Sequence, residues 1–156
     1  MTDKKSLLGK ILKERILVLD GAMGTMIQQY ELNETDFRGA KFAKHSSDLK
    51  GNNDILCLTK PQIISEIHET YLKTGCDIIE TNTFNANRIS QADYETEEFC
   101  YDLNKKAASI AKRACITFSS KEKPRFVAEP WDLQTRLCLF HLKLRIRDIV
   151  MLPLMK

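Results

Sequence analysis

Two clusters of polar and glycine residues follow short apolar runs in the sequence, at residues 20–25 and 80–83. The backbone N–H groups of residues 21–23 can hold a carboxylate, and the side chains of Asp20 and Glu80 can pair with an amine. An amino acid carries both groups, so the two clusters together predict a site for an amino-acid ligand. Each cluster also has a purely structural interpretation, as an ordinary strand-to-helix turn for the glycines and a helix cap for the aspartate.

The elements that must position these clusters are expected to alternate between strands and helices. The expected order is a helix at residues 6–14, strands at 15–19, 77–84 and 125–128, and helices at 61–74 and 99–114. Pro61 suits the first position of a helix, and Gly75 suits its end. Such alternation implies an α/β fold with a parallel sheet and right-handed crossovers. Because binding groups gather at the carboxyl ends of parallel strands, we expect both clusters at one rim of the sheet.

A long polar stretch, residues 30–53, separates the first cluster from the helix that begins at Pro61. Loops of this length are usually functional or disordered. His45 lies in the stretch, and the sequence identifies no partner for it. His68 falls among helical positions, where we expect it to be solvated or to cap the helix. We therefore assign neither histidine to a site.

The composition fits one domain with a hydrophobic core, because the 156 residues are 43% hydrophobic with a formal net charge of +3. The 6 Gly and 4 Pro exclude collagen, and 5 Cys without a CxxC pair do not suit a small disulfide scaffold. The longest apolar runs are far shorter than the roughly 20 residues that a bilayer requires. We therefore expect a cytoplasmic chain with no signal peptide and no membrane or nucleic-acid partner.

Five motifs occur in order between about residue 7 and residue 128, namely DGAMGT, FRG, DLKGNND, TKP and ETNTF. Together they resemble the N-terminal homocysteine-binding domain of the cobalamin-dependent methionine synthases. The combination is far more specific than any single motif. The resemblance implies a homocysteine S-methyltransferase with an eight-stranded (β/α) barrel, the TIM-barrel fold. Residues 1–128 would supply about three of the eight strands, so the barrel of this chain is expected to be incomplete.

The resemblance gives both polar clusters a role in substrate binding. It implies that Asp20 contacts the homocysteine amine and that the backbone of residues 21–23 holds the homocysteine carboxylate. The candidate substrate-binding residues are Asp20, Gly21, Ala22, Met23, Glu80, Thr81, Asn82 and Thr83. In the complete family enzyme, zinc activates the homocysteine thiol, since metal coordination lowers a thiol pKa, and methylcobalamin supplies the methyl group.

The family's zinc ligands are three cysteines on late barrel strands, and no cysteine of this chain matches them. The five cysteines here are Cys57, Cys76, Cys100, Cys115 and Cys138. We therefore expect this chain to contain no metal ligand, catalytic residue or bound cofactor, and to lack catalytic competence by itself. The alternatives are a noncatalytic homocysteine-binding fragment and a truncated product without function.

The sequence departs from the family after Ala128, where the family continues with a Gly-rich strand end and a GPTN motif. One G inserted before the codon of Glu129 permits a continuation that begins GALGPTN. We therefore predict that residues 129–156 are a frame-shifted tail. Its 5 basic and 3 acidic residues would then result from the shifted reading frame and not from selection for a binding partner. A genuine divergent tail is the alternative, and sequencing genomic and transcript DNA across this junction distinguishes the two.

Overall fold

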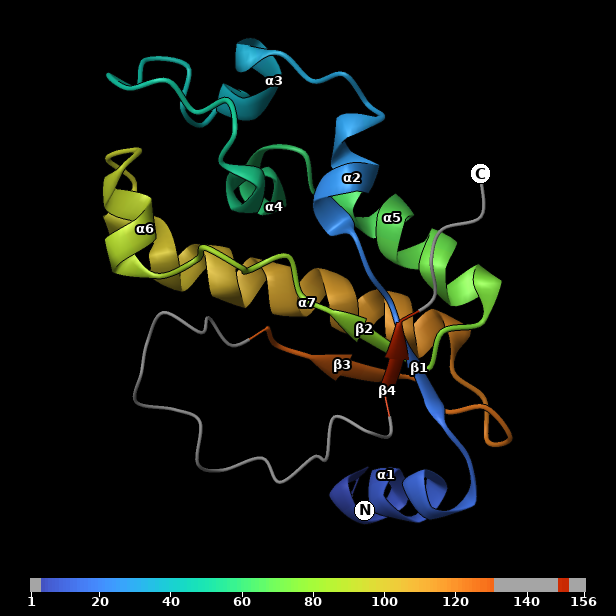
Figure 1. Cartoon of the computed structure of the whole chain (residues 1–156). Helices are drawn as coiled ribbons and strands as arrows, with labels where there is room; N and C mark the ends of the chain where they lie inside the picture. The colour runs from blue at the N-terminus through green and yellow to red at the C-terminus, as the bar shows by residue number, and fades with distance from the viewer. Residues whose placement is uncertain (1–3, 131–148, 152–156) are drawn as a thin grey trace.

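The computed structural model describes residues 4–130 and 149–151 of the chain (Figure 1). The elements, with η for 3-10 helices, are α1 (Lys4–Glu14), β1 (Leu17–Leu19), α2 (Met23–Gln28), α3 (Glu34–Arg38), η1 (Asn53–Ile55), α4 (Leu56–Thr59), α5 (Pro61–Thr74), β2 (Ile78–Glu80), α6 (Arg88–Ala92), η2 (Glu97–Phe99), α7 (Cys100–Phe118), β3 (Phe126–Ala128) and β4 (Ile149–Met151). The predicted alternation of strands and helices is confirmed, and the chain has an α/β fold.

The strands form one parallel sheet in the order β3-β2-β1-β4. Leu19 of β1 lies opposite Ile78 of β2, and Ile78 lies opposite Phe126 of β3. The three expected strands are therefore neighbours, and the ends of β1 and β2 lie side by side. This register brings the two polar clusters of the sequence to the same rim.

The fourth strand differs from the expectation of three strands. β4 comes from the tail and pairs in parallel with β1 on the side away from β2. An apolar segment with two β-branched residues suits a strand. Its local sequence does not determine which strand it pairs with. Residues 131–148 and 152–156 lie outside the described residues, and the frame shift of the tail stays a prediction.

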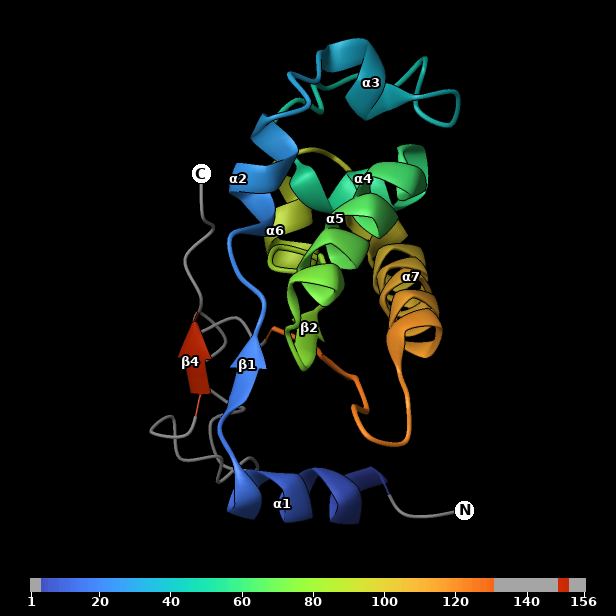
Figure 2. The same ribbon diagram turned by 90° about the vertical axis from the view of Figure 1, so that its right-hand side faces the viewer.

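Helices α5 and α7 pack against each other and cover one face of the sheet (Figure 2). Val18 of β1 and Ile79 of β2 contact the hydrophobic core that lies between this face and the helices. The helices contribute the buried side chains Ile64, Ile67, Leu72, Leu103 and Ile110. Burial of each such side chain stabilises the fold by roughly 1.5–3 kcal/mol, so this layer holds the strands and their ends in place.

Helix α5 begins and ends where the sequence predicts, with Pro61 at its first position and Gly75 after its last turn at φ 108°. The expectation for His68 is wrong, because this side chain is fully buried. His68 lies four residues after Ile64 and three before Tyr71, which places it on the buried face of the helix. Neither ring nitrogen of His68 has a hydrogen-bonding partner among the described residues.

Residues 30–53 are more ordered than a polar loop. Asn33 and Asp36 form a capping box at the start of α3, a signal that the sequence carries as Asn-x-x-Asp. The Glu34 carboxylate accepts hydrogen bonds from the N–H groups of residues 49–50, at 2.8 and 2.7 Å. These contacts fold the stretch back on itself and return the chain to the rim of the sheet.

The two ends of the sheet differ in what covers them. Helices α2, α3 and α4 gather at one end, and α1 lies at the opposite end (Figures 1 and 2). Because α2 follows β1 after three residues, its end of the sheet is the carboxyl end of the strands. None of the helices in the described part of the chain combines the length and hydrophobicity that a membrane crossing requires.

Candidate functional site

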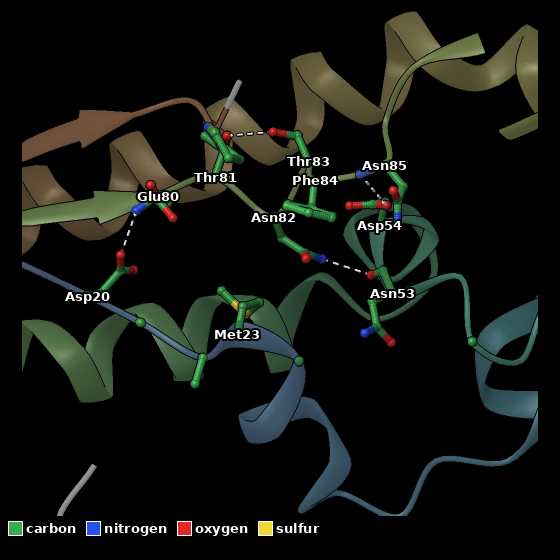
Figure 3. Close-up of a pocket in the computed structure, with 15 residues that line it drawn as sticks. Asp20, Met23, Asn53, Asp54, Glu80, Thr81, Asn82, Thr83, Phe84 and Asn85 are labelled. Atoms are coloured by element: carbon green, nitrogen blue, oxygen red, sulfur yellow. Dashed lines mark hydrogen bonds between the residues drawn. The ribbon is translucent and has the colours of Figure 1, made fainter. Parts of the chain in front are cut away.

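The rim of the sheet contains a pocket of about 270 Å³ at the ends of β1 and β2 (Figure 3). All eight candidate residues, 20–23 and 80–83, line this pocket. The lining also includes residues that the sequence analysis did not select, namely Gly24, Gly51, Asn53, Asp54, Phe84, Asn85 and Pro130. The pocket therefore has one wall from residues 20–24 and 80–83 and a second wall from Gly51, Asn53, Asp54, Phe84 and Asn85.

Two carboxyl groups lie together at one side of the pocket. Asp20 Oδ1 accepts a hydrogen bond from the backbone N–H of Glu80 at 2.9 Å. Asp20 is only 5% exposed, and Glu80 is partly buried. Neither forms an ion pair with another described residue. This corner of the pocket therefore has a negative potential that a cationic group of a ligand can neutralise.

Burial sets the protonation of this pair. Burial raises the pKa of Asp20 to about 7, the negative charge of Glu80 adds to the rise, and the hydrogen bond from the Glu80 N–H opposes it. Burial also raises the pKa of Glu80. An ammonium group beside Asp20 would favour its charged form and bring its pKa back down.

The backbone of residues 21–23 forms the second corner of the pocket. Ala22 has the left-handed conformation, with φ 30° and ψ 47°, immediately before α2 begins. Neither Gly21 nor Gly24 has a positive φ, so the left-handed position of this turn is occupied by Ala22. Among the described residues, the N–H groups of residues 21–23 have no hydrogen-bond acceptor. Since residues 21–23 line the pocket, these unpaired donors could hold an anionic group there.

Asp54 lies in the second wall of the pocket. Its carboxylate is 2% exposed and accepts a hydrogen bond from the backbone N–H of Asn85 at 3.1 Å. Burial raises the pKa of Asp54 to about 6, and the N–H groups of Asn85 and Phe84 oppose this rise. The polar run GNND before an apolar segment is the sequence signal that could have pointed to this wall.

Asn82 connects the two walls. Its side-chain Nδ2 donates a hydrogen bond to the backbone carbonyl of Asn53 at 2.8 Å. Thr81 and Thr83 lie beside it, and their hydroxyl groups are hydrogen-bonded to each other at 2.8 Å. The N–H of Thr81 donates to the carbonyl of Ala128 at 2.9 Å, which ties the rim to β3. Of the second cluster, Glu80 is therefore the group with the greatest capacity to bind a charged ligand.

The cysteines of the described residues do not fit a zinc site. No group of three or more His, Cys, Asp or Glu side chains in the described part of the chain is placed to hold a metal ion. Burial raises the pKa of Cys57 and of Cys76 to about 12, so both are neutral thiols in this fold. Cys57 instead donates a hydrogen bond through Sγ to the carbonyl of Asn82 at 3.5 Å. Cys138 lies outside the described residues.

Comparison with known proteins identifies relatives of this chain. Residues 17–131 match the family model described as homocysteine S-methyltransferase. Two crystal structures of the homocysteine methyltransferase MmuM from Escherichia coli are similar in fold. The metallated form has 23% sequence identity and a TM-score of 0.58 over 80% of this chain. The oxidized form has 22% identity and a TM-score of 0.55 over 72% of this chain.

The matched part of these two structures is short compared with their full length. It covers 39% of the metallated chain and 36% of the oxidized chain. The present fold therefore corresponds to part of the barrel of such a methyltransferase, as the motifs predict. The four described strands are too few to close a barrel, since eight are needed.

Proposed function

Because the chain belongs to the homocysteine S-methyltransferase family, we propose that its rim pocket binds homocysteine. The observation that carries this proposal is that, among the described residues, one pocket contains both carboxyl groups without a cationic partner and N–H donors without an acceptor. Asp20 and Glu80 lack a cationic partner among the described residues, and the N–H groups of residues 21–23 lack an acceptor there. The ammonium group of an amino acid can pair with the carboxyl groups, and its carboxylate can accept from the N–H groups.

In this proposal, the ammonium group of homocysteine lies against Asp20, with Glu80 adding to the negative potential. The carboxylate accepts hydrogen bonds from the N–H groups of residues 21–23, and their fixed directions orient the amino acid. The thiol end then lies away from both charged corners. The role of this chain is to bind the substrate and to fix its orientation, which is a prerequisite for any transfer to the sulfur.

We also propose that the complete protein is a cytoplasmic methionine synthase of the cobalamin-dependent kind. The motif set DGAMGT, FRG, DLKGNND and ETNTF supports this assignment. In such an enzyme zinc lowers the pKa of the homocysteine thiol, and methylcobalamin donates the methyl group. The cysteines of the described residues do not fit the zinc. We therefore expect this chain alone to bind homocysteine without forming methionine.

Calorimetric titration of the full chain with reduced homocysteine tests the binding site. Asp20→Asn removes the charge but keeps an oxygen that can accept the Glu80 N–H, and the exposed Asp93→Asn is the matched control. Since hydrogen bonds to charged groups contribute about 1.5–3 kcal/mol, we expect Asp20→Asn to weaken binding about 10- to 100-fold. The control should bind as the native chain does.

An analogue sharpens this test. The compound 4-mercaptobutanoate lacks the amine of homocysteine but keeps its carboxylate and thiol. The native chain should bind it more weakly than homocysteine, and Asp20→Asn should bind the two compounds with similar affinity. Homocysteine affinity of the native chain should also rise between pH 6 and 8, as Asp20 becomes charged. Equal affinity of the native chain for both compounds would show that the amine has no site at Asp20.

A second measurement tests the absence of turnover. The chain is incubated with zinc, homocysteine and methylcobalamin, after which metal content and methionine are determined. We expect binding of homocysteine without methionine formation. Stoichiometric zinc together with methionine formation would overturn this part of the proposal and leave the binding site untouched.

A further inference from the structure

Gln91 of α6 is a fully buried polar residue that does not line the pocket. Its side-chain amide uses its whole hydrogen-bonding capacity. Nε2 donates to Asn52 Oδ1 at 3.2 Å and to the carbonyl of Asn85 at 3.0 Å. Oε1 accepts from Asn52 Nδ2 and from Thr96 Oγ1, both at 2.8 Å. Two donors and two acceptor positions are all that an amide side chain has.

These bonds join two segments that are far apart in the sequence. Asn52 belongs to the segment 51–54, which precedes α4, and Asn85 belongs to the segment 82–85, which follows β2. Both segments contribute residues to the second wall of the pocket. The two hydrogen bonds between the Gln91 and Asn52 amides hold segment 51–54. The bond from the same Gln91 side chain to the Asn85 carbonyl holds segment 82–85.

Among the described residues, two further side chains link these segments directly. Asn82 Nδ2 donates to the carbonyl of Asn53, and the Asp54 carboxylate accepts the N–H of Asn85 (Figure 3). Asn82 and Asp54 both line the pocket, so a ligand bound there would lie beside them. Gln91 is fully buried and does not line the pocket, so a ligand there would not contact its side chain directly.

We propose that Gln91 is a positioning residue of the rim pocket, which fixes the separation of segments 51–54 and 82–85 and thereby the shape offered to the substrate. The Asn85 carbonyl can only accept, so it requires Nε2 on its side, and the Thr96 hydroxyl then donates to Oε1 at the other end of the amide. The inference rests on the proposed function only in naming homocysteine as the ligand. The linkage of the two segments is independent of that ligand.

The variants Gln91→Leu and Gln91→Glu test this role in the full chain. Leucine has a similar length and makes none of the four bonds. Protonated glutamate keeps one of the two donors of the amide, and ionised glutamate keeps none for Asn52 or for the Asn85 carbonyl. The matched control is Gln62→Leu, which changes an exposed glutamine at the start of α5.

Two readouts are measured for each variant, amide hydrogen exchange and homocysteine affinity. For Gln91→Leu we expect faster exchange confined to residues 51–55 and 82–86, and an affinity roughly tenfold below that of the native chain at every pH. For Gln91→Glu we expect an affinity at pH 6 that lies between those of the native chain and Gln91→Leu, and that falls toward the leucine value at pH 8. Gln62→Leu should change neither readout.

The outcomes separate this inference from the proposed function. If Gln91→Leu loosens the segments but binds homocysteine as the native chain does, Gln91 has no positioning role and the inference is overturned. If the native chain binds no homocysteine, the proposed function fails, and hydrogen exchange alone then decides whether Gln91 holds the two segments. Should Gln91→Leu not fold, the pH series of Gln91→Glu makes the same comparison within a single protein.

Discussion

Two buried aspartates lie at opposite ends of the β1–β2 pair, and only one of them has a cationic partner among the described residues. Asp77, at the amino end of β2, accepts hydrogen bonds from Arg15 at 2.7 and 2.8 Å and from the N–H of Val18 at 3.0 Å. Asp20, at the carboxyl end of β1, accepts only a backbone N–H. The buried aspartate at the amino end thus has a cationic partner, whereas the one at the rim has none among the described residues.

The pKa values of the two groups express the same difference. Burial alone would raise the pKa of Asp77, but the hydrogen bonds from Arg15 and Val18 hold it below its usual value. Burial raises the pKa of Asp20 to about 7. Asp77 therefore stabilises the fold when charged, and Asp20 destabilises it when charged. This contrast distinguishes a structural carboxylate from one that is available for binding.

The largest effect is expected at the amino end of the sheet. Asp77→Ala leaves Arg15 and the Val18 N–H without their acceptor, so we expect the free energy of unfolding to fall by about 2–3 kcal/mol at pH 7. This value is below that of a fully buried pair because the Arg15 side chain is 41% exposed. Urea unfolding measures the change, with Asp93→Asn as the control. A loss of less than about 0.5 kcal/mol, as for an exposed ion pair, would show that the Asp77–Arg15 pair does not stabilise the fold and would contradict the contrast with Asp20.

Asp20→Asn should act in the opposite direction. Between about pH 4 and 7 the folded chain binds more protons at Asp20 than the unfolded chain, so the native free energy of unfolding falls as the pH rises. We expect Asp20→Asn to remove this slope and to stabilise the chain by about 1–3 kcal/mol at pH 8. Urea titrations at pH 5, 6.5 and 8 measure it. Destabilisation at pH 8 would mean that Asp20 has a partner in the fold.

Bound homocysteine should give the aspartates at both ends of the sheet a cationic partner. Its ammonium group gives Asp20 the kind of partner that Asp77 already has in Arg15. Saturating homocysteine should therefore reduce the loss of stability between pH 6.5 and 8 in the native chain and have no such effect in Asp20→Asn. The same urea titrations with and without the ligand measure this, and an equal effect on both proteins would place the ligand elsewhere.

Asp54 gives a smaller version of the same test, since its pKa rises only to about 6. Asp54→Asn keeps an oxygen for the N–H of Asn85 and removes the buried charge. We expect stabilisation of about 1 kcal/mol at pH 8 and none at pH 4. Unfolding in urea at the two pH values decides this. An equal change at both values would show that the side chain acts through its shape and not its charge.

The first wall of the pocket could be predicted from the sequence, whereas the second is marked there only by the polar run GNND at residues 51–54. Residues 20–23 and 80–83 follow apolar strands directly, and parallel pairing brings such ends together. The second wall depends on long-range contacts, such as the Glu34 carboxylate on the N–H groups of residues 49–50 and the Gln91 amide on Asn52. No local pattern encodes these contacts.

The same limit applies to the fold. Pro61, Gly75 and the apolar period between them predict α5 correctly, because helix boundaries and faces are local properties. The position of β4 beside β1 was not predicted, because an apolar tripeptide does not specify its neighbour. The apolar period does not predict the burial of His68, because that pattern marks only the aliphatic and aromatic residues of the buried helix face.

His68 offers the smallest and most local test of the contrast, because it is a buried titratable group that is kept neutral. Burial lowers the pKa of His68 to about 4, so between about pH 4 and 6.5 the unfolded chain binds more protons at this residue. The native free energy of unfolding therefore rises with pH across this range, opposite in sign to the Asp20 contribution.

His68→Leu should remove that rise. It should change the free energy of unfolding at pH 7 by less than about 1 kcal/mol, since an apolar side chain replaces a polar ring that has no hydrogen-bonding partner among the described residues. Urea unfolding of His68→Leu in the Asp20→Asn background isolates the slope. If the slope persists there, the acid sensitivity arises from another group, and His68 has a partner when protonated.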